Sequence, residues 1–116
     1  MTIWVRLKDS LPSEAEATVL AERIRAARPA AEIWLFGSLA RGRPRLGSAI
    51  DLAVVLPDAD FAGCRATDLV TALRHAAGPR EHGLDLVVFR RTLFEARAGD
   101  ANALEAVVRR EGRRIA

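Results

Sequence analysis

Two acidic residues and a glycine–serine pair carry the chemistry that this sequence of 116 residues suggests. Gly37-Ser38 closes one apolar run, Asp51 lies at the beginning of a second, and Asp85 lies near the beginning of a third. Backbone N–H groups favour phosphate where such a turn opens a helix. Neighbouring carboxylates bind hard divalent cations. The pattern therefore predicts a site for a phosphorylated ligand together with metal ions.

Position 49 decides how complete the metal site is. Side chains alternate between the faces of a strand, so positions 49 and 51 share a face and are about 6.6 Å apart along it. Two acidic residues at these positions would both reach a shared pair of magnesium ions. Position 49 is alanine, so only Asp51 can bind metal from this strand.

Asp85 lies within the apolar run LDLVVF, residues 84–89. An unpaired carboxylate in such a strand is costly and needs a cation or hydrogen-bond donors. If the strands that carry them are neighbours, Asp85 can face Asp51 and complete a metal site. The alternative is a structural salt bridge between Asp85 and one of the many arginines.

The elements that must position these residues follow from turn residues and apolar spacing. Ser13 and Glu16 fit a capping box, in which Glu16 reaches back to the start of the helix, and Pro29 ends that helix. Short apolar runs predict three strands, at residues 33–36, 50–56 and 84–89. Further helices are expected at residues 61–77, 92–98 and 100–110, the last with Asp100 as its N-cap. This order predicts an α+β fold, a short mixed sheet with helices packed on one face.

Length and composition suit a single domain spanning residues 1–116. The net charge is +3, and Cys64 is the only cysteine, which excludes an intramolecular disulfide. The beginning of the chain lacks a leader pattern, and no apolar stretch could cross a membrane, so a cytoplasmic location is expected. His75 and His82 are expected to be ordinary surface or partly buried residues. Trp4 and Trp34 are expected to pack in the core or at an interface.

The motifs resemble those of one known family. GSLARG (residues 37–42) and SAIDL (residues 48–52) match the pattern Gly-Ser, ten residues, Asp-x-Asp of minimal nucleotidyltransferase domains in the DNA polymerase beta superfamily, except at Ala49. LDLVVF matches the later strand that carries the third acid, and EAVVRREGRRIA resembles the terminal helix. The resemblance covers nearly the whole chain.

This resemblance implies a magnesium-dependent transfer of a nucleoside monophosphate from a triphosphate such as ATP to a hydroxyl group. Gly37 and Ser38 would hold the triphosphate, and Arg41 could neutralise its charge. In the family two magnesium ions are bound: Asp51 would bind both, and Asp85 would bind the one that activates the acceptor. Ala49 occupies the vacated carboxylate position, so we expect strongly reduced activity. Two origins fit Ala49: a substitution made to trap an inactive complex, which the loss of a single motif residue favours, or natural degeneration.

Free-standing domains of this length resemble antitoxins whose partner is a HEPN ribonuclease toxin, which they silence by adenylylating a tyrosine. The chain has no tyrosine, so the acceptor must lie elsewhere. The main alternative is a non-catalytic antitoxin that neutralises its partner by forming a complex. A drug-modifying enzyme would need an additional helical domain, and no element for direct nucleic-acid binding is visible. The nucleotide, acceptor and oligomeric state do not follow from the sequence.

Overall fold

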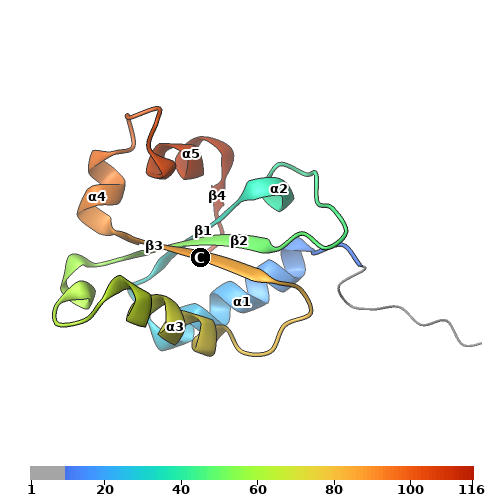
Figure 1. The fold of residues 1–116 in the computed structure, drawn as a ribbon, viewed down its shortest axis with the longest axis horizontal. Coiled ribbons are helices and arrows are strands. Elements are labelled where there is room, and N and C mark those ends of the chain that lie inside the picture. The colour runs from blue at the N-terminus through green and yellow to red at the C-terminus, as the bar shows by residue number, and fades with distance from the viewer. Residues whose placement is uncertain (1–9) are drawn as a thin grey trace, which may run out of the picture.

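A four-stranded mixed sheet forms the centre of this computed structural model, which describes residues 10–116 (Figure 1). The strand order is β3-β2-β1-β4, with β2 parallel to β3 and β1 antiparallel to both β2 and β4. The strands are β1 (Glu32–Phe36), β2 (Ile50–Leu56), β3 (Leu84–Arg90) and β4 (Arg113–Arg114). The predicted mixed fold class is confirmed.

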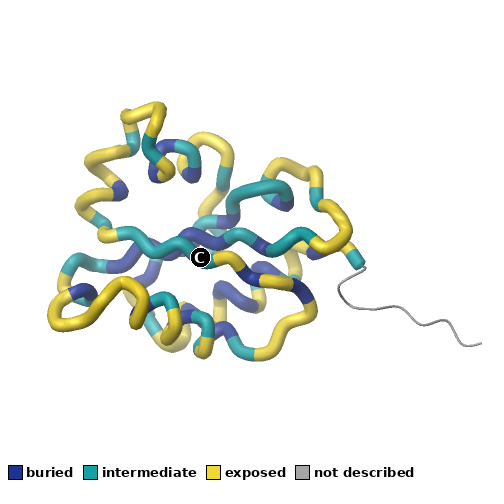
Figure 2. The backbone as a smooth tube through the Cα atoms, in the orientation of Figure 1, coloured by how far each residue is buried: buried dark blue, intermediate teal, exposed yellow. Residues whose placement is uncertain are grey.

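Two long helices, α1 (Glu14–Ala27) and α3 (Ala66–Ala77), cover one face of the sheet. Their apolar stripes, at the 3.6-residue period of a helix, pack on every second residue of the central strand. Figure 2 shows this interior as a buried band between exposed outer surfaces. The buried side chains of this layer include Leu20, Ile24, Leu69, Leu73, Ile50, Leu52, Val54 and Leu56.

The opposite face of the sheet carries α4 (Arg91–Ala96) and α5 (Leu104–Glu111). Phe94 of α4 and Val108 of α5 pack on Ala53 and Val55 of β2, and all four residues are buried. The sequence analysis placed helices on one face, whereas the structure has them on both. The reason is that the second set of β2 side chains is also apolar beyond Asp51, so this central strand needs cover on each side.

Three element boundaries differ from the predicted ones. The expected helix 61–77 is divided into a 3-10 turn, Asp58–Phe61, and α3, with Gly63 at a φ of 75° between them. The expected helix at 100–110 begins only at Leu104, because Asp100 accepts a hydrogen bond from the Asn102 N–H (3.0 Å) in a preceding turn. The expected terminal helix ends before Gly112, and β4 then pairs with β1.

Ser13 caps α1 as predicted, because its Oγ accepts a hydrogen bond from the Glu16 N–H at 3.2 Å. The Glu16 carboxylate does not reach back to the cap, however, but binds the backbone before β3. The predictions about the beginning of the chain and about Trp4 fall outside the described residues. Trp34 is partly buried against Phe94, with ring centroids 5.8 Å apart. Within residues 10–116, no helix is both long and apolar enough to cross a membrane.

Candidate functional site

Asp51 and Asp85 lie directly beside each other on the parallel strands β2 and β3. Both follow a buried residue of the α1–α3 layer, Ile50 and Leu84, so their side chains point to the opposite face. Asp51 is half-buried and Asp85 is exposed. The structure thus brings together the two acids that the sequence singled out, and Asp85 has solvent access that its apolar neighbours did not suggest.

The pKa of Asp51 is raised to about 6. Burial contributes most, followed by the negative charge of Asp85 and by hydrogen bonding between the two carboxyls, while the positive charge of Arg41 acts in the opposite direction. The pair therefore concentrates negative charge that a bound cation would stabilise. Its donors are all carboxylate oxygens, the ligands that magnesium prefers, so the pair fits Mg²⁺ with one carboxylate fewer than the family pattern.

Gly37 makes room for the Asp51 carboxylate. β1 ends at Phe36, which pairs with Asp51, and the chain then turns through Gly37 with a φ of 74°. A Cβ atom on Gly37 would collide with an Asp51 carboxylate oxygen. The sequence analysis assigned Gly37 to phosphate binding alone; the structure adds a steric requirement, since any side chain there displaces Asp51.

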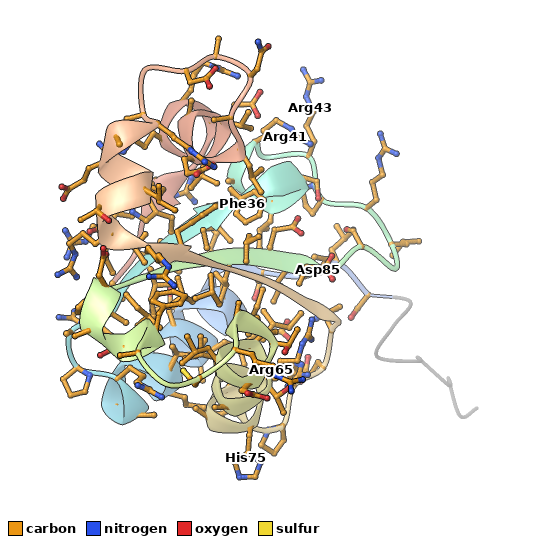
Figure 3. The ribbon with its side chains drawn as sticks, turned by 60° about the vertical axis from the view of Figure 1, so that its left-hand side comes forward. Phe36, Arg41, Arg43, Arg65, His75 and Asp85 are labelled. Carbon is orange, nitrogen blue, oxygen red and sulfur yellow. The ribbon has the colours of Figure 1, made fainter. Side chains whose placement is uncertain are left out.

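A basic cavity of about 360 Å³ lies beside this turn. It is lined by Ser38, Arg41, Arg43, Arg45 and Ser48, and Figure 3 shows Arg41 and Arg43 following the short helix α2 (Gly37–Ala40). Arginine pairs bidentately with phosphate oxygens, so this lining suits a triphosphate.

Three of the cavity residues, Arg43, Arg45 and Ser48, were missed as site residues. Arginine at every second position from residue 41 to 45 was available as a signal in the sequence, but only Arg41 was assigned to the site.

Ser48 closes the turn that carries Arg45. Its Oγ accepts a hydrogen bond from the Arg45 N–H (3.0 Å) and donates one to the Arg45 carbonyl (2.6 Å). At the other end of the cavity, the Arg41 guanidinium lies 3.9 Å from the Glu111 carboxylate of α5. The arginine loop is therefore held locally by a serine and linked to the terminal helix through Arg41.

Comparison with known proteins agrees with this geometry. Residues 18–93 match the family model of the nucleotidyltransferase domain. The chain belongs to the nucleotidyltransferase family. A crystal structure from Sulfolobus solfataricus, of a protein described as a candidate nucleotidyltransferase, superposes on it with a TM-score of 0.54. That protein is 20% identical, and the match covers 71% of this chain and 70% of the other, so it supports the fold. Comparison with curated proteins gave no significant match.

Position 49 of this nucleotidyltransferase lies beside Gly83. Ala49 is half-buried, one residue before β2, and the Ile50 N–H donates to the Gly83 carbonyl at 2.8 Å, which extends the ladder with β3. A Cβ on Gly83 would lie 3.5 Å from the Ala49 Cβ. Because Gly83 has no side chain, Ala49 has only backbone as its neighbour just before β3, on the same face as Asp51 and Asp85.

Proposed function

We propose that this nucleotidyltransferase is an antitoxin that transfers AMP from ATP to a tyrosine hydroxyl of a HEPN ribonuclease toxin. The observation that supports transfer is the in-register pair Asp51 and Asp85, packed on Gly37 beside a cavity lined by arginines. The chain contains no tyrosine, so a tyrosine acceptor belongs to another molecule. Asp85 is exposed, which leaves the site accessible to a hydroxyl on a protein surface.

Each side chain has a role in this reaction. Arg41, Arg43 and Arg45 neutralise the triphosphate, while Asp51 and Asp85 hold magnesium, which stabilises the attacking and leaving oxygens when bound. The acceptor oxygen forms a bond to the α-phosphorus as the bond to pyrophosphate breaks. The exposed carboxylate of Asp85 takes up the hydroxyl proton.

Ala49 favours a second candidate function, a non-catalytic antitoxin that acts by forming a complex. Two carboxylates hold a pair of metal ions less well than three, which weakens transfer. The arginine-lined cavity lies on a different segment of the chain, so binding of a phosphorylated ligand does not depend on position 49.

One experiment separates the two functions. The chain and its Ala49→Asp form are each incubated with a candidate HEPN toxin, ATP and magnesium, and the intact mass of the HEPN protein is measured. An added AMP unit supports transfer and identifies donor and acceptor together. A stable complex without added mass in either form supports the binding role. If neither form binds or modifies the HEPN protein, both proposals fail.

A further inference from the structure

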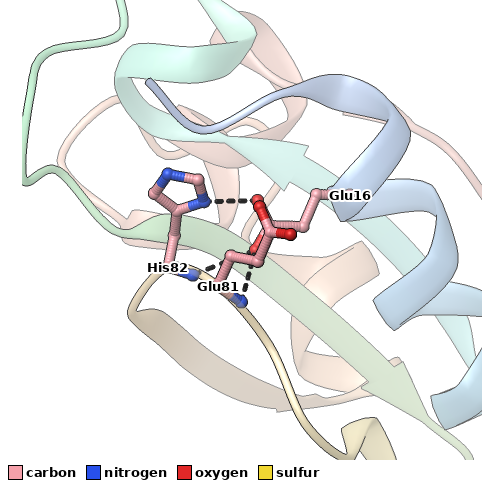
Figure 4. A group of neighbouring side chains, drawn as sticks. All are labelled: Glu16, Glu81 and His82. Atoms are coloured by element: carbon pink, nitrogen blue, oxygen red, sulfur yellow. Dashed lines mark hydrogen bonds and ion pairs between the residues drawn. The ribbon is translucent and has the colours of Figure 1, made fainter. Parts of the chain in front are cut away.

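A second cluster of metal-ligating side chains lies away from the transfer site. Glu16 projects from the first turn of α1, Glu81 and His82 precede β3, and one ligand atom from each lies within 4.8 Å of the others (Figure 4). His82 is two residues before the buried Leu84, so it lies on the α1 side of the sheet, whereas Asp85 points to the opposite face. The cluster is therefore separate from the nucleotidyltransferase site and does not depend on the proposed function.

His82 is the buried centre of this cluster, with 7% of its surface exposed. Its Nε2 lies 2.9 Å from the Ser10 Oγ and 3.2 Å from the Ser10 carbonyl oxygen. When Nε2 donates to the Ser10 carbonyl, the lone pair of the neutral ring is on Nδ1. Nδ1 contacts the Glu16 carboxylate. In this tautomer two ligand atoms, Nδ1 and a Glu16 oxygen, face the same point.

The carboxylate of Glu16 is fixed in the orientation that a ligand needs. Its Oε2 accepts hydrogen bonds from the backbone N–H groups of Glu81 (3.2 Å) and His82 (3.0 Å), which turns Oε1 toward the imidazole (Figure 4). Metal ligands are commonly held by such outer hydrogen bonds, including one from the second ring nitrogen of a histidine to a carbonyl. The arrangement of Ser10, His82 and Glu16 follows that design.

Glu81 supplies a third ligand that is free to turn. It is exposed, and among the residues that the structure describes its carboxylate has no hydrogen bond or ion pair. A cleft of about 570 Å³, lined in part by Ser13, Glu16 and His82, opens beside it and leaves room for a water molecule and for entry of an ion.

We propose that Glu16, Glu81 and His82 form a zinc site with water as the fourth ligand. Magnesium prefers oxygen ligands alone, whereas zinc binds imidazole nitrogen and carboxylate oxygen at about 2.0–2.2 Å in a tetrahedral arrangement. Two tetrahedral ligands are then about 3.4 Å apart, so Glu81 turns inward and the contact between Glu16 and His82 lengthens.

Zinc at this position joins α1 to the start of β3. The loop before β3 is already tied to α1 by the Arg23 guanidinium, which donates to the Ala77 carbonyl (3.0 Å) and the Pro79 carbonyl (2.8 Å). Beyond His82, the Gly83 carbonyl accepts the Ile50 N–H. A bound zinc therefore fixes the segment that connects α1 with the pairing of β2 and β3, and it stabilises the folded chain through linkage.

The test is titration of the metal-stripped full chain with zinc chloride in excess magnesium, followed by calorimetry. A Cys64→Ser background is used because Cys64 is a free, exposed cysteine and thiolates are zinc ligands. We expect one zinc per chain. The isosteric variant Glu81→Gln should weaken zinc binding at least about tenfold without changing the melting temperature in the absence of zinc. Glu22→Gln, at an exposed position of the same helix, is the matched control and should bind zinc like the unaltered chain.

A second readout uses cobalt, which replaces zinc and gives visible absorption bands typical of tetrahedral ligation. The bands should be lost in Glu81→Gln and retained in Asp85→Asn, which alters only the transfer site. The proposal is overturned if zinc binds equally well to Glu81→Gln, if no zinc binds once Cys64 is replaced, or if Asp85→Asn removes the binding.

Discussion

Aspartate at position 49 is expected to increase magnesium-dependent AMP transfer by at least tenfold. The neighbour of Ala49 across the strands, Gly83, presents only backbone, so no side chain of β3 lies against this position. The new carboxylate would join Asp51 and Asp85 on one face at the start of β2 and β3. The Ala49→Asp form then has the three acids that two magnesium ions require in this family.

The size of the effect follows from the charges. A carboxylate about 4 Å from one unit of positive charge contributes roughly 4 kcal/mol at an effective dielectric constant of about 20. Water takes the place of the carboxylate in the Ala49 form and recovers part of this, about half. The remaining 2 kcal/mol or so corresponds to a rate difference of about 30-fold, at roughly 1.4 kcal/mol for each factor of ten.

The assay compares initial rates of AMP addition to the partner protein, measured by intact mass at saturating ATP and magnesium. Ala49→Asn is the matched control, since its side chain has nearly the same size but no charge, and it should recover much less activity. Ala49→Asp combined with Asp51→Asn should lose activity again. Equal rates for the Ala49 and Ala49→Asp forms, with both folded and bound to the partner, would refute the three-acid reasoning.

Three further predictions concern the same site. Without metal at pH 7.5, Ala49→Asp should melt about 3–5 °C lower than the unaltered chain, because a third acid about 6.6 Å from Asp51 adds roughly 1 kcal/mol of repulsion. With added magnesium, Ala49→Asp should melt at the higher temperature of the two. Asp51→Asn should raise the melting temperature at pH 7.5 but not at pH 4. The pKa of Asp51 is about 6 in the fold against an ordinary 3.8, so the folded state loses stability as the pH rises through 6. The difference between the two pKa values corresponds to about 3 kcal/mol in the free energy of unfolding, which solvent screening reduces to about 1 kcal/mol for a half-exposed carboxyl. If Asp51→Asn changed the melting temperature equally at both pH values, this prediction would be contradicted. Gly37→Ala should abolish transfer because its Cβ displaces Asp51. Gly42→Ala is the control: Gly42 has a similar φ of 72° but open space around its Cβ, so this variant should lose only stability. Equal activity of the two variants would show that Asp51 is not displaced.

The strands and the pair of acids could be predicted because they depend on local patterns. The run from Ile50 to Leu56 is bounded by turn residues, and β2 has these same limits in the structure. Asp51 and Asp85 each lie one residue after the start of an apolar run, so parallel pairing in register places them side by side. The packing of helices on the second face was not predicted. Ala53 and Val55, the apolar residues that follow Asp51 on the same face of β2, carried the signal for it.

Other features depend on contacts between distant segments and could not be predicted from local patterns. Glu16 fits a capping box by spacing, yet its carboxylate binds backbone N–H groups 65 and 66 residues later. The strand β4 contains only Arg113 and Arg114, a pair with no apolar pattern, and it forms because Gly112 lets the chain approach β1 closely. The collision that Gly37 avoids also requires knowing that Asp51 is the partner of Phe36.

In the proposed reaction, the groups that would bind phosphate lie on a different segment from those that would bind metal. The three arginines of the cavity follow β1 on one loop, whereas the acids begin the neighbouring strands β2 and β3. Replacing a carboxylate at position 49 by a methyl group therefore removes negative charge from the acids and leaves the arginines unchanged. The site of this chain is therefore less negative than one with three acids. In the proposed reaction Ala49 weakens the transfer step, while the arginine-lined cavity still attracts a triphosphate. This is the behaviour expected of a chain that binds its ligand and partner but turns over slowly.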